Sequence, residues 1–402
     1  MAGNIPSEIK TDLLKKEFRV ELANIMDWWA ANMIDEQHGG FFGQRNAKGE
    51  LVERVDKGII LNSRLLWTYS AAAIATGDSI YKRLADRAFR YVKDYFWDEV
   101  QGGVFWSVDY MGNYADDQKQ IYAQAFTIYA LSEYFILTQK KEVLDMASEI
   151  FWLVEKYSHD TEKRGYYNAF ARDWTDVDDI RLSEKDANEA KIMNTHLHVL
   201  EAYTNFYRVE PSLYVKKALL EVLQLFLDYF YNPENGSLHI YFDENWNPKG
   251  DHISFGHNIE ASWLLWEAAE ILKETSILKR VKEICLFMAE NVYQMAIDKD
   301  GGLLYEADPS GIIDSDKHWW PQAEAVIGFW NAYQLTGQEK YAKASVNTWS
   351  FIKNSIIDPI YGEWHWRTDR DGNPILTEDK AGPWKAPYHN IRMCLEMMMR
   401  LT

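Results

Sequence analysis

The sequence predicts an all-α protein, a closed (α/α)6 barrel of twelve helices with short β-hairpins at one end. The main observation is a turn that recurs six times, in which a glycine is followed by aromatic or aliphatic residues. The turns begin at Gly39, Gly102, Gly165, Gly236, Gly301 and Gly362. Two helical patterns lie between one turn and the next. A regular internal period of this kind indicates a repeat architecture.

Each turn is predicted to lead into a short strand. Acidic or Asn residues usually precede the glycine, as Asp298 and Asp300 precede Gly301. Asp, Asn and Gly are typical of turns because they tolerate or stabilise tight backbone conformations. The residues that follow, such as Phe105 and Trp106, are typical of strands. The hairpins are therefore expected between successive helix pairs.

The helices are predicted from apolar periodicity. Within residues 79–97, Tyr81, Leu84 and Ala88 form one apolar stripe, and Asp78 or Ser79 fits an N-cap. The same reading places the twelve helices near residues 7–34, 61–76, 79–97, 121–137, 140–157, 189–209, 212–231, 257–273, 276–296, 320–336, 338–356 and 388–401.

Six helix pairs could form an open solenoid or close on themselves. An open array usually ends in a polar capping repeat, whereas the last helix, 388–401, is as apolar as those in the middle. We therefore predict closure. No linker rich in Pro, Gly or Ser divides the chain, so residues 1–402 are expected to form one catalytic domain. The longest charged loop, 170–190, is either a lid or a solvated loop without a function.

Composition excludes several classes of function. The formal net charge is −18, which argues against nucleic acid or an anionic membrane as a partner. Two cysteines, Cys285 and Cys394, cannot form a disulfide framework. The charged N-terminus lacks the apolar segment of a signal peptide, and no run of 18 apolar residues occurs. We expect a cytoplasmic monomer or weak homodimer that acts on a small molecule.

Polar residues near the starts of the inner helices are the candidate site. An apolar barrel core would not contain them without partners. One set falls in each repeat, so all are expected around one mouth of the barrel; the alternative is a structural network between helices. The set consists of Arg64, Tyr122, Gln124, Asn194, His198, His257, Glu260, Trp320, Glu324 and His389.

The residue types in this set favour proton transfer. His257 and His389 occupy matching repeat positions, and two bases on opposite faces of a carbon can remove and return a proton α to a carbonyl. Arg64, among apolar residues, requires an anion, either a carboxylate or a reaction intermediate. Glu260 and Glu324 could instead serve glycoside hydrolysis. His196 points away from His198 on their helix, so no metal site is expected.

Five segments together resemble a known family: NSRLLWTYSAA from residue 62, MNTHLHVLEAYTNFYR from 193, FGHNIEASWLLWEA from 255, WWPQAEAVIG from 319 and WKAPYHNIR from 384. They are similar to the N-acylglucosamine 2-epimerase superfamily, most of all to its bacterial cellobiose 2-epimerases. The resemblance runs from about Trp28 to His389 and implies an (α/α)6 barrel and no cofactor.

The resemblance also implies a reaction. It is the epimerisation at C2 of the reducing-end glucose of β-1,4 disaccharides, cellobiose to glucosyl-mannose and lactose to epilactose, through a cis-enediolate. In the roles it implies, His257 and His389 exchange protons, Arg64 holds the enediolate and His198 assists. The implied substrate-binding residues are Tyr122, Asp186, Asn194, Glu260, Trp263, Trp320, Glu324 and Trp384.

Two alternatives remain open at this point. A related enzyme of the superfamily would be an N-acylglucosamine 2-epimerase or a mannose isomerase. A protein of a different class on the same barrel would be a glycoside hydrolase or a non-catalytic sugar binder.

Overall fold

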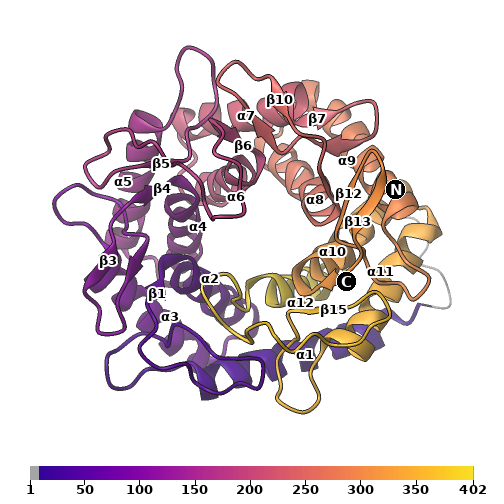
Figure 1. The fold of residues 1–402 in the computed structure, drawn as a ribbon, viewed down its shortest axis with the longest axis horizontal. Helices are drawn as coiled ribbons and strands as arrows, with labels where there is room; N and C mark the ends of the chain where they lie inside the picture. The colour runs from indigo at the N-terminus through magenta and orange to yellow at the C-terminus, as the bar shows by residue number, and fades with distance from the viewer. Residues whose placement is uncertain (1–8, 402) are drawn as a thin grey trace.

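The computed structural model describes residues 9–401, and it forms two concentric rings of α-helices (Figure 1). The inner ring consists of α2 (Ile59–Thr76), α4 (Ile121–Thr138), α6 (Met193–Val209), α8 (Phe255–Leu272), α10 (Trp319–Thr336) and α12 (Tyr388–Arg400). The outer ring consists of α1 (Thr11–Asn32), α3 (Ser79–Tyr91), α5 (Lys141–Tyr157), α7 (Leu213–Leu225), α9 (Thr275–Met295) and α11 (Glu339–Phe351). Helix α12 packs against both α10 and α2, which closes the ring. The predicted closed (α/α)6 barrel is confirmed.

The two rings differ in burial, as the sequence patterns require. Inner helix α2 is buried on all sides from Ile59 to Ala73 because it packs against both neighbours and the outer ring. Outer helix α3 buries one face, and Asp78 caps it by accepting a hydrogen bond from the Ile80 N–H. The inner helices therefore carry side chains toward a common axis.

Three outer helices continue into a π-helical turn that the apolar pattern did not distinguish from α-helix. These turns are η1 (Val92–Phe96) after α3, η2 (Phe226–Phe230) after α7 and η3 (Ile352–Ile356) after α11. They account for the predicted ends near residues 97, 231 and 356. Among the described residues, no helix has the length and apolar run needed to cross a bilayer.

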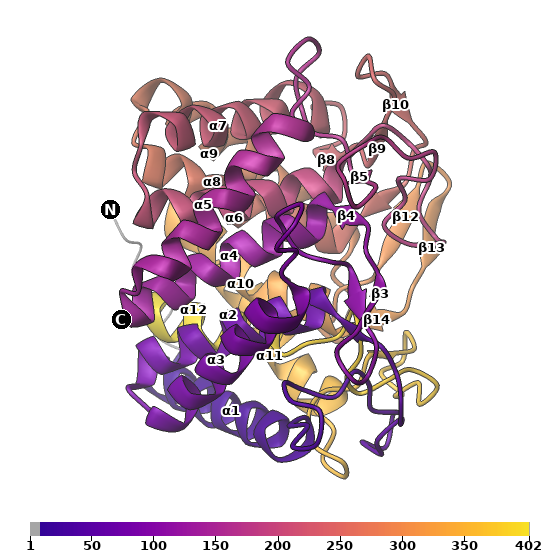
Figure 2. The same cartoon turned by 90° about the vertical axis from the view of Figure 1, so that its left-hand side faces the viewer.

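Short antiparallel strands gather at one end of the barrel (Figure 2). They are β1 (Lys57–Gly58), β2 (Ser107–Val108), β3 (Tyr114–Asp116), β4 (Lys119–Gln120), β5 (Ala169–Phe170), β6 (Lys191–Ile192), β7 (Tyr231–Asn232), β8 (Ser237–Leu238), β9 (Tyr241–Phe242), β10 (Pro248–Lys249), β11 (Ile253–Ser254), β12 (Glu306–Asp308), β13 (Gly311–Asp314), β14 (Lys317–His318) and β15 (Arg367–Thr368). Strands β1, β4, β6, β11 and β14 each run directly into an inner helix. The strand end therefore fixes where these helices begin.

Buried side chains tie each hairpin to the start of an inner helix. The Gln124 amide bonds both the N–H and the carbonyl of Val104, and His196 Nε2 accepts from the Tyr166 N–H. Gln124 thus belongs to the structural network that we considered as the alternative to a site, and His196 points away from His198 as predicted. Buried ion pairs reinforce several hairpins: Lys57–Asp35, Lys119–Asp98, Lys191–Asp160 and Lys380–Asp358. Another buried lysine, Lys317, pairs with Asp298 and with the more exposed Asp300.

Candidate active site

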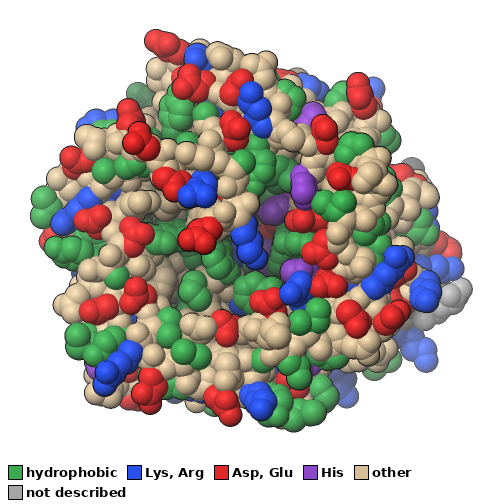
Figure 3. All heavy atoms as spheres, in the orientation of Figure 1, with side chains coloured by type: hydrophobic (Ala, Val, Ile, Leu, Met, Phe, Trp, Pro, Cys, Tyr) green, Lys and Arg blue, Asp and Glu red, His purple; other side chains and the backbone are tan. Residues whose placement is uncertain are grey.

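The hairpin end of the barrel is hollowed near its axis, with charged and histidine side chains around the hollow (Figure 3). All six inner helices begin at the hairpin end, and each has one residue at an equivalent position in its second turn. This is the sixth residue of α2, α4, α6, α8 and α10 and the fifth residue of α12. These residues are Arg64, Phe126, His198, Glu260, Glu324 and Arg392. All six are buried, and five of them are polar.

Arg392 is the centre of a buried ionic network. Its Nη2 donates to Oε1 of Glu260 and Oε1 of Glu324, both at 2.6 Å, and its Nη1 donates to Glu201. Three carboxylates from three helices therefore share one guanidinium, which neutralises part of their charge. Sequence reasoning missed Arg392, although its position three residues after His389 on one helix face was a usable signal.

His389 is held by one of these carboxylates. Its Nδ1 lies 2.6 Å from Glu324 Oε1 and 3.9 Å from Glu260 Oε1. Burial, together with the positive charge of Arg392, lowers the pKa of His389 well below its ordinary value. Burial and the neighbouring Glu324 raise the pKa of Glu260 to about 7. The imidazole is therefore neutral and oriented.

His257 and His389 both lie beside the indole of Trp320. The ring centroid of Trp320 is 4.9 Å from that of His257 and 5.5 Å from that of His389. The Nδ1 of His257 is hydrogen-bonded to Ser254 Oγ at 2.8 Å. Burial, and secondarily the charge of His198, lowers the pKa of His257 to about 3. Both predicted proton-transfer residues thus border one side chain, and both are neutral near pH 7.

Arg64 enters the site without an acidic partner. Its Nη2 donates to Tyr122 Oη and its Nη1 to the Trp384 carbonyl, each at 2.9 Å. The guanidinium lies 4.5 Å from the centre of the Phe126 ring. Within residues 9–401, no carboxylate is within ion-pair distance of Arg64. Its charge is therefore available to an anion in the lumen.

His198 completes the polar wall. Its Nδ1 is 2.9 Å from Glu201 Oε2, and its ring packs against Tyr122 and Phe126. Burial alone would raise the pKa of Glu201, but Arg392 and His198 lower it to about 2. Glu201 is thus ionised and joins His198 to the Arg392 network.

The other predicted binding residues lie at different depths. Trp263 donates its indole N–H to Glu324 Oε2 at 3.0 Å and is buried beneath the network. Asn194 is half-buried at the start of α6, and its Oδ1 has no hydrogen-bond donor within the described part of the chain. Asp186 lies on the rim, where Tyr241 Oη donates to it at 3.1 Å. The Ser183 hydroxyl also donates to Asp186, at 2.7 Å.

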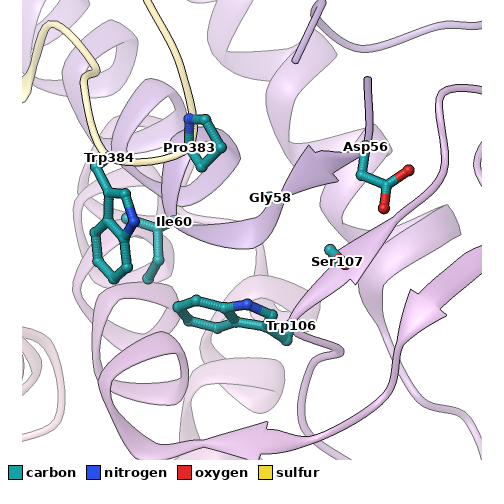
Figure 4. A pocket seen from close by; sticks show the side chains of 7 residues that line it. All are labelled: Asp56, Gly58, Ile60, Trp106, Ser107, Pro383 and Trp384. Atoms are coloured by element: carbon teal, nitrogen blue, oxygen red, sulfur yellow. The ribbon is translucent and has the colours of Figure 1, made fainter. Parts of the chain in front are cut away.

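A cavity of about 200 Å³ lies at the hairpin end of the barrel, lined by Asp56, Gly58, Ile60, Trp106, Ser107, Pro383 and Trp384 (Figure 4). The indoles of Trp106 and Trp384 border the cavity. Ile60 lies next to Trp384, and Pro383 lies above both indoles in this view. The two indole centroids are 5.8 Å apart. Sequence analysis treated Trp106 only as part of a hairpin, because its motif recurs in every repeat.

Glu260, Glu324 and His389 also form the one group among the described residues whose ligand atoms could surround a metal ion, all lying within 4.8 Å of one another. However, the same Oε1 atoms of both glutamates accept hydrogen bonds from Arg392. A cation there would have to displace the guanidinium. The donor set therefore fits an ion-pair network rather than a metal.

Comparison with known proteins identifies the family. The sequence profile of the N-acylglucosamine 2-epimerase (GlcNAc 2-epimerase) family matches residues 40–393. The chain belongs to this family. The predicted resemblance is confirmed, and so is the expectation of an enzyme of the epimerase class.

Relatives of this N-acylglucosamine 2-epimerase family member agree over nearly its full length. The chain is 43% identical to the cellobiose 2-epimerase of Bacteroides fragilis over 96% of this chain and 99% of that one. It is 39% identical to the cellobiose 2-epimerase of Ruminococcus albus, with the same coverage. The solved structure of cellobiose 2-epimerase from Bacillus thermoamylovorans superposes with a TM-score of 0.93 at 37% identity, covering 97% of this chain and all of that one.

Proposed function

We propose that the protein is a cofactor-independent cellobiose 2-epimerase. It would invert C2 of the reducing-end glucose of β-1,4 disaccharides, turning cellobiose into glucosyl-mannose and lactose into epilactose. The observation that carries the proposal is the pair of neutral imidazoles, His257 and His389, beside the same Trp320 indole. Arg64, without an acidic partner, lies in the same lumen.

The reaction follows from these groups. On the open-chain sugar, one imidazole Nε2 removes the C2 proton, and the electron pair moves onto the C1 carbonyl oxygen to give a cis-enediolate. Arg64 offsets the negative charge that develops on this oxygen. For the return step the other histidine takes up a proton from solvent on Nε2 and delivers it to the opposite face of C2, and the carbonyl re-forms with inverted configuration. The proton that the first histidine removed then passes to solvent, so the C2 hydrogen is exchanged in each turnover. His198, oriented by Glu201, would assist ring opening.

The carboxylates favour this reaction over glycoside hydrolysis. A hydrolase needs two carboxyl groups on either side of the scissile bond, one of them free to give a proton. Glu260 and Glu324 are instead buried side by side on Arg392 Nη2. They therefore serve to orient His389 and Arg392 and do not flank a substrate bond.

The cavity at the mouth supports a disaccharide substrate. Trp384 connects it to the reacting centre, because its carbonyl accepts from Arg64 while its indole faces Trp106. Apolar indole faces can pack against a sugar ring, and burial of such a face contributes to affinity. A second sugar ring attached to the reacting one would find its contacts there. An N-acylglucosamine has no second ring to place there.

Product analysis in heavy water tests the proposal. Cellobiose should yield glucosyl-mannose that carries deuterium at C2. Release of glucose would instead indicate a hydrolase. Turnover of N-acetylglucosamine or mannose with none of cellobiose would assign the chain to another branch of the family.

A further inference from the structure

The three histidines of the predicted site differ in the group that holds Nδ1. His198 and His389 are held by carboxylates, Glu201 Oε2 at 2.9 Å and Glu324 Oε1 at 2.6 Å. His257 is held by a hydroxyl, Ser254 Oγ, at 2.8 Å. The partner of Nδ1 decides which ring nitrogen carries the proton, and so which nitrogen is free for chemistry.

Ser254 occupies the N-cap position of α8, where a serine side chain usually caps the helix. It is the residue before α8, and a serine at that position normally accepts a backbone N–H from the first helical turn. Its side chain makes no such bond here, although the imidazole that it contacts belongs to the third residue of that turn. The hydroxyl is thus directed at the ring.

The hydroxyl is also fixed in space. Ser254 is 5% exposed and belongs to β11, where it pairs with Glu306 of β12. The His257 ring packs against Trp320 as well as Ser254. A Cβ at Gly256 would lie 2.5 Å from the Trp320 ring, so the glycine permits this close approach. Hydroxyl and indole together leave the imidazole little freedom.

We infer that Ser254 is a positioning residue for His257. Its Oγ accepts the Nδ1–H, which fixes the tautomer that leaves the Nε2 lone pair free toward the lumen. This inference rests on the proposed function for its kinetic consequence, because a base must present its lone pair to the C2 proton. The bond itself is independent of any substrate.

Nuclear magnetic resonance of the full chain with isotope-labelled histidine tests the bond directly. The His257 signals are assigned by their loss in His257→Ala. We expect wild type to show the proton on Nδ1, Ser254→Ala to show a mixture of both tautomers, and Ser254→Thr, which keeps a hydroxyl, to resemble wild type. A wild-type proton on Nε2, or a Ser254→Ala spectrum identical to wild type, would overturn the inference.

Kinetics on cellobiose separate positioning from a general structural effect. Ser254→Ala should lower kcat roughly 10- to 100-fold, as misplacement of a base does, with KM changed less than about twofold. Ser254→Thr should restore most of kcat. The control is Ser262→Ala in α8, the helix that carries His257. The Ser262 side chain is buried and its hydroxyl donates to the Ile259 carbonyl, and this variant should have the kcat and KM of wild type. Inactivity of wild type on cellobiose would count against the proposed function, and the ring spectra would still decide on Ser254.

Discussion

Replacement of Arg392 by Met tests the buried network on which the site is built. The change removes the guanidinium that Glu201, Glu260 and Glu324 share, and it leaves three buried carboxylates without their main counter-charge. Loss of one partner from a buried ion pair costs about 3–5 kcal/mol. Glu201 gives an independent figure: its pKa is about 2 against an ordinary 4.5, which corresponds to about 3 kcal/mol in favour of the ionised form.

The effect should depend on pH with a definite sign. In wild type the lowered pKa of Glu201 contributes stability that is present above its ordinary value and is lost as pH falls toward 2. In Arg392→Met the pKa of Glu201 should rise above its ordinary value, and the already raised pKa values of Glu260 and Glu324 should rise further. The variant therefore loses more stability than wild type as pH rises above about 4.5. The difference between the two proteins should therefore grow from acidic to alkaline pH.

Urea unfolding at about pH 5.5 and about pH 8 measures this difference. We expect the variant to be less stable by about 3–5 kcal/mol at the higher pH and by clearly less at the lower. Arg280→Met is the matched control, because Arg280 is half-exposed and pairs with Asp228 at the surface; it should cost less than about 1 kcal/mol. A loss below about 1 kcal/mol for Arg392→Met, or one that does not increase with pH, would refute the reasoning.

Three further predictions address the rest of the site and its frame. Trp106→Ala should lower kcat/KM for cellobiose by about 10-fold or more through loss of contact with the second sugar ring, with a smaller effect on the monosaccharide mannose; equal effects on both sugars would contradict the assignment. Arg64→Met should lower kcat about 100- to 1,000-fold while the far-ultraviolet circular dichroism stays that of wild type, and retained kcat would exclude its role at the enediolate. Asp98→Asn should destabilise the fold by about 3 kcal/mol at pH 7, because it removes the partner of the buried Lys119, and an unchanged urea midpoint would show that the pair is dispensable.

The fold could be predicted because its signals are local. The Gly-aromatic turns mark the hairpins, and the apolar stripe of each outer helix marks the face that it buries. The π-helical turn that begins at Val92 could not be predicted, because a segment of five residues is too short to show a period different from that of an α-helix. Closure was predictable from the apolar last helix, since that helix requires a partner on each side.

The site was predictable only where residue type and repeat position coincide. His257 and His389 stand out because histidines rarely recur at matching positions of apolar helices. Arg392 did not, since its partners come from three other helices and only the folded barrel brings them together. The same holds for Trp106, which resembled the other hairpin aromatics until the fold placed it beside Trp384.

The exchange of the C2 hydrogen in single-histidine variants tests the central claim most directly. In heavy water, wild type should place deuterium at C2 of both sugars as they interconvert. With one of His257 and His389 replaced by Ala, the remaining imidazole can remove and return a proton only on its own face. One variant should therefore exchange the C2 hydrogen of cellobiose, and the other that of glucosyl-mannose, while neither interconverts the two sugars. Wild-type rates of interconversion in either variant, or a product without deuterium at C2, would contradict the account.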